Sequence, residues 1–271
     1  MRTRSISAAL VAALLLAGCG QDRASTSTAT ADPSPSRSAE PAPEHDPDAL
    51  AGAVRRAAAG LGTVKEVTPP EYEPGATSTV QMALCETPRP LQGGYGTPVD
   101  VRSFFSVVAT TRPAAYRSGG QRAEALGELR VAAVRPGARG GPERYFDTLR
   151  AQKCTGGSVH MVTVPSPGTI GYRSASGAAK VGGGTAAVAT VSVDADELDA
   201  GGSYPLLGHA RVIMRHRGYL IEASVLCARP GRPAEGRRTT AEARSRALAM
   251  AERTVKELDA LAPRPTPSVT G

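Results

Sequence analysis

The sequence contains no tryptophan and little lysine: four of its 32 basic residues are lysine, and the others are arginine. Asparagine is also absent, whereas alanine, glycine, arginine and proline are abundant. These abundant residues have GC-rich codons, so the net charge of +7 is weak evidence for a polyanionic partner. Removal of residues 1–18 would leave 30 basic and 25 acidic residues, a charge of +5.

Long apolar runs are absent except near the N-terminus. Arg2 and Arg4 precede an apolar run from Ile6 to Leu16, which has the length of a signal-peptide core but is shorter than the roughly 20 residues of a membrane-spanning helix. The run ends in Leu16-Ala17-Gly18-Cys19 and resembles the lipobox of a bacterial lipoprotein. An ordinary secretory signal needs no cysteine at this point. A secretory signal with a chance cysteine, or an uncleaved anchor, is the alternative.

The lipobox resemblance implies that the Cys19 sulfur receives a diacylglyceryl group and that cleavage makes Cys19 the first residue. Two or more acyl chains give stable anchoring. We therefore expect the chain at the outer face of the cytoplasmic membrane, with the lipid bilayer as its partner through Cys19. That location argues against a nucleic-acid partner.

Composition divides the rest of the chain. Residues 19–47 carry the lipidated cysteine and are otherwise rich in Ser, Thr, Ala and Pro, which predicts a disordered tether. Residues 48–262 have the length of one domain, and residues 263–271 form a Pro-rich tail. The tether would reach roughly 30 Å from the membrane.

Hydrophobic periodicity within 48–262 predicts an α+β domain, an antiparallel sheet with helices packed on it. The clearest signal is a hairpin in which two apolar strands flank Arg217-Gly218. Asp48 is expected to cap the first helix, and Pro142 to begin the second. The expected helices are 48–60, one from 142 ending near 154, and 240–261; the expected strands are 79–85, 99–109, 126–134, 159–164, 185–193, 209–215 and 219–227.

Catalytic and metal-binding motifs are absent from the sequence. There is no G-x-S-x-G and no C-x-x-C, and the four histidines, His45, His160, His209 and His216, lack the i, i+4 spacing of a zincin. Lys180 precedes its glycines, the reverse of a phosphate-binding loop, so this segment is expected to be a turn. We expect no metal or cofactor and no enzymatic activity.

Two arginines of the late hairpin are candidate ligand-binding residues. Arg211 and Arg215 share the parity of one strand, so their side chains point to the same face of the sheet. Guanidinium groups recognise carboxylate and phosphate, and together they could line a cleft for an anionic group. An exposed sheet face is the alternative.

The order of these features resembles that of the PknH-like extracellular sensor domain, which occurs in actinobacterial lipoproteins and receptor kinases. The resemblance covers about residues 48–262 and rests on the lipobox, the tether, the helix that carries Tyr145-Phe146-Asp147, the Arg217-Gly218 hairpin and an Ala-rich closing helix. It implies an antiparallel sheet with flanking helices that form a cleft, and a ligand-sensing role.

The resemblance also implies a disulfide. Cys154 and Cys227 fit the positions of one family pair, the end of a helix and the last strand, whereas Cys85 has no remaining partner. The pair Cys85–Cys154 is the alternative. We expect a non-enzymatic surface lipoprotein that binds an unidentified ligand or envelope partner. A cell-envelope hydrolase with an unrecognised active site, or a structural adaptor, is the alternative.

Overall fold

The structure is a computed structural model that describes residues 45–68, 78–85, 98–134, 141–161, 168–194, 205–230 and 236–262. The lipobox, Cys19 and the tail lie outside these residues. The elements are α1 (Pro47–Ala59), β1 (Val64–Thr68), β2 (Ser78–Met82), β3 (Val99–Thr111), β4 (Ala114–Ser118), β5 (Gln121–Val134), α2 (Pro142–Arg150), β6 (Gly157–Met161), β7 (Gly168–Val181), β8 (Gly184–Asp194), β9 (Pro205–His216), β10 (Tyr219–Pro230) and α3 (Gly236–Asp259).

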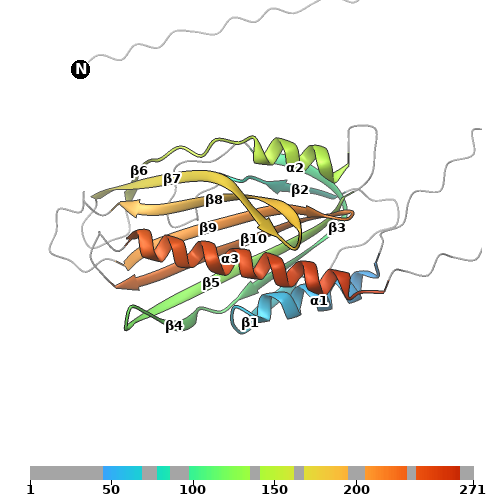
Figure 1. Cartoon of the computed structure of the whole chain (residues 1–271), viewed down its shortest axis with the longest axis horizontal. Coiled ribbons are helices and arrows are strands. Elements are labelled where there is room, and N and C mark those ends of the chain that lie inside the picture. Colours follow the sequence, from blue (N-terminus) through green and yellow to red (C-terminus); the bar gives the residue numbers. More distant parts are fainter. Residues whose placement is uncertain are drawn as a thin grey trace, which may run out of the picture. The chain divides into compact units, whose positions relative to one another are not determined.

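The described strands form one ten-stranded antiparallel sheet (Figure 1). Its order is β1-β3-β5-β10-β9-β8-β7-β6, while β2 pairs with β3 and β4 with β5. Tight hairpins join β7 to β8 and β9 to β10, and every pair of neighbouring strands is antiparallel. The predicted α+β class is therefore confirmed.

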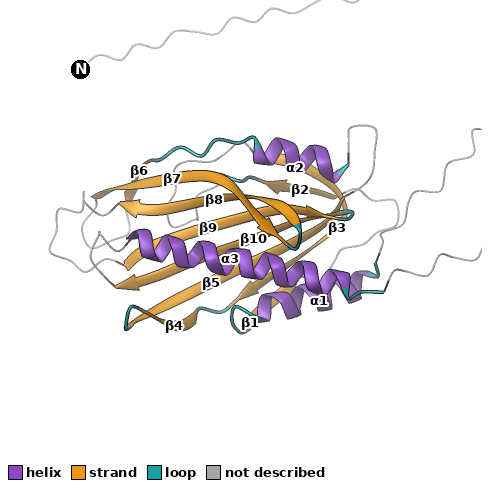
Figure 2. Cartoon of the chain, in the orientation of Figure 1, coloured by secondary structure: helices purple, strands orange, loops and turns teal. Residues whose placement is uncertain are grey.

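The helices cover opposite faces of the sheet, α1 and α3 on one and α2 on the other. Figure 2 shows α3 in front of the strands and α2 along their upper side. Alternation along β9 produces the two cores, because Val212 and Met214 pack under α3, whereas Ile213 packs under α2. The α3 face carries the larger apolar core. The α2 face is covered by a helix of nine residues and carries polar and charged side chains beyond it.

Close contact between α3 and the sheet requires a glycine. A Cβ atom on Gly208 of β9 would lie 2.4 Å from the Thr240 nitrogen and 2.5 Å from the Thr239 carbonyl carbon. A side chain at this position would push the first turns of α3 away from the sheet. Gly208 thus lets the backbone of α3 lie directly on β9.

The first helix begins earlier than its sequence predicts. Asp46, and not Asp48, is the N-cap: its Oδ1 accepts hydrogen bonds from the backbone N–H groups of Asp48 and Ala49. His45 was predicted to belong to the tether, but it is fully buried, and its Nδ1 lies 2.7 Å from the hydroxyl of Tyr219. The folded part therefore includes His45, because its ring stacks on that of Tyr219 at the start of β10.

The hairpin of β9 and β10 is confirmed, with Arg217 in the left-handed region at φ 51° and Tyr219 paired with His216. The turn predicted after Lys180 is also present, as a two-residue turn at Gly182 and Gly183. Strands β1, β4 and β7 were not predicted. Among the described residues, no helix is long and apolar enough to cross a membrane.

Candidate functional site

The cysteine pairing differs from the predicted one. Cys85, just after β2, forms a disulfide with Cys154, four residues beyond the end of α2, with 5.0 Å between their Cα atoms. The predicted Cys154–Cys227 pair is wrong, because Cys85 and Cys154 lie with the α2 core, whereas Cys227 lies in the core on the other face of the sheet. The bond joins the exit of α2 to the sheet and fixes the helix at that end.

Cys227 is a fully buried free thiol under α3. Burial raises the pKa of this thiol. Burial, together with the neighbouring Cys227 and Glu242, also raises the pKa of Tyr116. Tyr116 donates a 2.8 Å hydrogen bond to Glu242 Oε2 on α3. A protonated thiol without access to solvent is a poor nucleophile. We therefore assign Cys227, Tyr116 and Glu242 a structural role, in which they pack α3 against β4 and β10.

A hollow of about 430 Å³ lies on the other face, where α2 meets the hairpin ends of β7–β8 and β9–β10. We call it the α2 pocket. It is rich in ionisable side chains, and Phe146 of α2 supplies the aromatic surface. Its lining residues are Glu143, Phe146, Asp147, Arg150, Gly184, Thr185, Arg215, His216 and Arg217.

Basic groups of the α2 pocket are held by acidic partners. Arg215 Nη1 contacts Glu143 Oε1 at 2.5 Å, and Arg150 Nε lies 3.0 Å from Asp147 Oδ1. The side chains of both pairs are about half exposed, between 48% and 58%. Exposed pairs of this kind contribute about 0–1 kcal/mol, so an incoming anion can replace a carboxylate at little cost.

Asp259, at the end of α3, fixes the far wall of the α2 pocket. One oxygen of its carboxylate, Oδ1, lies 2.9 Å from both His216 Nε2 and Arg217 Nη2. The β9–β10 turn is therefore held against α3. This arrangement positions the Arg217 guanidinium beside the pocket before any ligand arrives.

Arg211 does not line the α2 pocket, although it shares a strand face with Arg215 as predicted. Its side chain is 9% exposed, its Nε lies 3.2 Å from Glu222 Oε1, and its Nη1 donates to the Ala83 carbonyl. Glu222 Oε2 lies 3.4 Å from Arg130 Nη1. Arg130, Glu222 and Arg211 thus form a buried charge row across three neighbouring strands.

His209 extends this buried polar layer by one further position along β9. Its Nε2 lies 2.7 Å from Ser224 Oγ on β10. Burial, and secondarily the Arg211 charge, lower the pKa of His209 to about 3. The ring is therefore neutral at physiological pH and acts as a hydrogen-bonding group of the core.

The sequence did not predict the acidic residues of the α2 pocket or of the charge row. Glu143 and Glu222 carried no local motif, and only the strand register and the packing of α2 bring them to Arg215 and Arg211. Within the described residues, no cluster of three or more His, Cys, Asp or Glu side chains could hold a metal ion. The acidic residues Asp196, Glu197 and Asp199, which follow β8 in the sequence, lie outside the described residues.

No protein-family model, curated protein or solved structure matches this chain. The resemblance to sensor domains therefore stays a prediction.

Proposed function

We propose that this chain is a lipid-anchored lipoprotein of the outer face of the cytoplasmic membrane whose domain binds an anionic ligand or envelope partner in the α2 pocket. Cys19 is the lipid anchor. The role of the domain is to bind a ligand and not to catalyse a reaction. The observation that carries the proposal is the pocket itself, where Arg150, Arg215 and Arg217 surround a hollow of about 430 Å³.

The charge arrangement favours exchange over permanent pairing. Arg215 and Arg150 are held at the pocket by exposed carboxylates, which orient the guanidinium planes but bind them weakly. A carboxylate or phosphate can accept two parallel hydrogen bonds from one guanidinium, which an exposed single contact does not provide. Phe146, which is 4% exposed, closes the bottom of the pocket as part of the core under α2.

A thermal-shift screen against anionic wall fragments and lipid headgroup phosphates tests the binding. A ligand at 100 times its Kd adds about 2.7 kcal/mol to the stability, which raises the melting temperature by about 5–11 °C in a domain of this size. We expect Arg215→Met and Arg150→Met to abolish the shift. Arg122→Met is the matched control, because Arg122 is 78% exposed and pairs with Glu124 on β5, outside the pocket.

If no anionic probe shifts the melting temperature and the protein hydrolyses substrates in ester or peptide panels, the enzymatic alternative is favoured over the binding proposal.

The anchor is tested separately by mass spectrometry of the N-terminal peptide. We expect an acylated Cys19, and we expect Cys19→Ala to release the protein from membranes.

A further inference from the structure

The sheet has an open edge beside the α2 pocket. Strand β7 pairs with β8 along Gly171–Val181, but β6 pairs only with its first part, Gly168–Tyr172. Among the described residues, no strand lies against the outer side of β7 from Ala175 to Lys180. We call residues 175–180 the open edge.

Strand register shows which backbone groups the open edge offers. The β7–β8 hairpin closes with Val181 opposite Gly184 across a two-residue turn, so odd-numbered residues of β7 exchange hydrogen bonds with β8. Even-numbered residues direct their N–H and C=O groups away from β8. Ser176, Ala178 and Lys180 therefore present donors and acceptors to an added strand.

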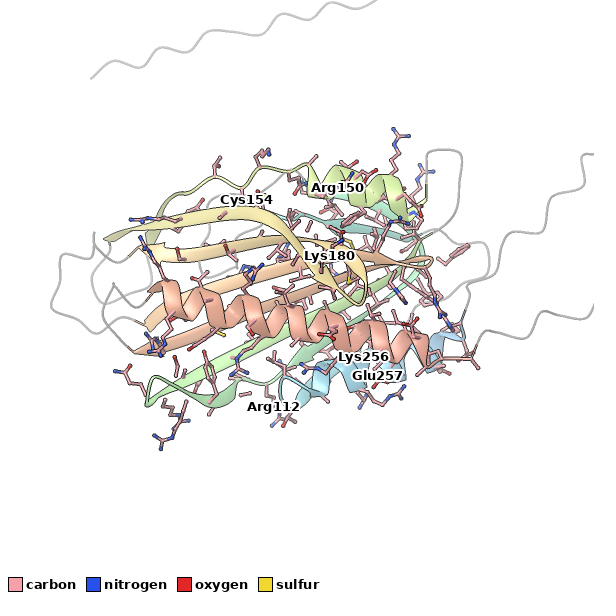
Figure 3. The ribbon with its side chains drawn as sticks, viewed as in Figure 1. Arg112, Arg150, Cys154, Lys180, Lys256 and Glu257 are labelled. Atoms are coloured by element: carbon pink, nitrogen blue, oxygen red, sulfur yellow. A yellow bond between two sulfur atoms is a disulfide. The ribbon has the colours of Figure 1, made fainter. Side chains whose placement is uncertain are left out.

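A second hollow, of about 280 Å³, adjoins the open edge. Ser176 and Ala178 form one wall, and the segment from Arg150 to Lys153 forms the other. Figure 3 shows Arg150 on α2 and Lys180 near the end of β7. The hollow shares Phe146, Arg150 and Thr185 with the α2 pocket, so the two hollows adjoin, and we call them together the groove.

The charge of the groove defines the occupant. The second hollow is lined by the basic side chains of Arg150 and Lys153 and by no acidic side chain. Lys180 adds a further exposed positive charge at one end of the open edge. An extended segment with carboxylate side chains satisfies both the backbone groups of the edge and these cations.

A second copy of this chain fits less well. Antiparallel pairing of two open edges about Gly177 would place Lys180 of each copy opposite Ser174 of the other, and residues 174–180 contain no carboxylate to meet the basic groups of the groove. Lysine on an edge strand is also a common device against self-association. An acidic strand supplies the carboxylates that a second copy lacks.

We propose that the open edge of β7 binds an extended acidic segment of a partner protein, which adds to the sheet as an antiparallel or parallel strand. This inference rests on the proposed binding function and specifies its partner class. The backbone of the segment pairs with Ser176, Ala178 and Lys180. Its acidic side chains reach Arg150 and Lys153 across the groove.

The test uses the full-length chain and an array of synthetic hexapeptides in which β-branched residues alternate with glutamate. A matched array carries lysine in place of glutamate, and a third array carries N-methylated backbones. We expect fluorescence anisotropy to detect binding of glutamate peptides, at least about tenfold weaker binding of lysine peptides, and loss of binding on N-methylation.

Protein variants separate backbone pairing from side-chain contact. Ser176→Pro removes an outward N–H, and proline is tolerated on an edge strand when that group faces away from the sheet. We expect at least about tenfold weaker binding in Ser176→Pro and unchanged binding in Ser176→Ala, which keeps the N–H. Ala178→Pro and Ala178→Ser repeat the comparison if Ser176→Pro does not fold.

Three outcomes would overturn this inference: no glutamate peptide binds, binding is insensitive to Ser176→Pro and Ala178→Pro, or the chain is a dimer that Ser176→Pro dissociates. If peptides fail while small anions still stabilise the protein through Arg215, the proposed function stands and only the strand addition is wrong. If small anions fail as well, both proposals are wrong.

Discussion

Glu222→Gln should destabilise the fold because it removes the one negative charge of the buried charge row. The Glu222 carboxylate lies 3.4 Å from Arg130 and 3.2 Å from Arg211, with its side chain 6% exposed. Arg130 is 25% exposed and has a second carboxylate, Glu128, at 3.5 Å. Arg211 is 9% exposed, so it cannot turn to water, and the cost falls mainly on this arginine.

Removal of one partner from a buried ion pair costs about 3–5 kcal/mol. Glutamine retains a hydrogen-bond acceptor, so we expect about 3 kcal/mol for Glu222→Gln and a melting temperature lower by about 6–12 °C. Glu128→Gln is the matched control, because it makes the same chemical change beside Arg130 at a side chain that is 47% exposed. It should cost less than about 1 kcal/mol.

Urea denaturation at neutral pH, with the disulfide intact, measures both variants. The double variant Arg211→Met with Glu222→Leu should recover most of the lost stability, because apolar side chains can replace a buried ion pair without leaving a charge. Equal stability losses in Glu222→Gln and Glu128→Gln would refute the assignment of a buried, mutually dependent charge row.

Three further predictions concern the cysteines and His209. Serine at both Cys85 and Cys154 should lower the free energy of unfolding by about 4 kcal/mol, since the bond closes a loop of 69 residues, as denaturant titration can show. The Cys227 thiol should react with a thiol reagent only after unfolding, because it is buried and its pKa is raised. Folding lowers the pKa of His209 to about 3, so the unfolded chain binds the additional proton as the pH falls below about 6.5. Stability should then fall by up to about 1.4 kcal/mol per pH unit, and His209→Gln should flatten that profile in melts recorded from pH 7 to pH 4.

The late hairpin was predictable because its signal is local. Period-two alternation from Tyr219 to Cys227 and the Arg217-Gly218 turn define both strands and their register. Strand β7 has no such signal, since Ser174 to Ala179 contains only small residues without β-branched side chains. Its strand conformation depends on pairing with β8, and this pairing cannot be predicted from the local sequence of β7.

The disulfide could not be derived from strand parity alone. Parity correctly places Cys227 on a core-facing side of its strand, but this sheet has a core on each face. Cys154 lies on the α2 side, and the sheet itself separates it from Cys227. The choice of partner depends on which face α2 covers, and that information lies in tertiary packing.

For Arg211 and Arg215 too, strand parity predicts the face of the sheet but not the surroundings of the side chain. Their shared face follows from spacing along one strand, as predicted. Their different environments follow from neighbours on other elements: Glu222 on β10 holds Arg211 in the core, and Glu143 on α2 holds Arg215 at the surface. Residue spacing finds candidate side chains, whereas register and helix packing decide which of them face solvent.

Helix α2 joins the stability of the fold to the proposed binding groove. The disulfide of Cys154 anchors the chain just beyond its C-terminal end, whereas near its N-terminal end Glu143 holds Arg215 through an exposed ion pair. On the proposed function, an anion that takes Arg215 from Glu143 would loosen the weak end and leave the covalent end in place. The wall formed by Arg150 and Lys153, close to the disulfide, would then keep its position beside β7 while the α2 pocket exchanged its ionic partners.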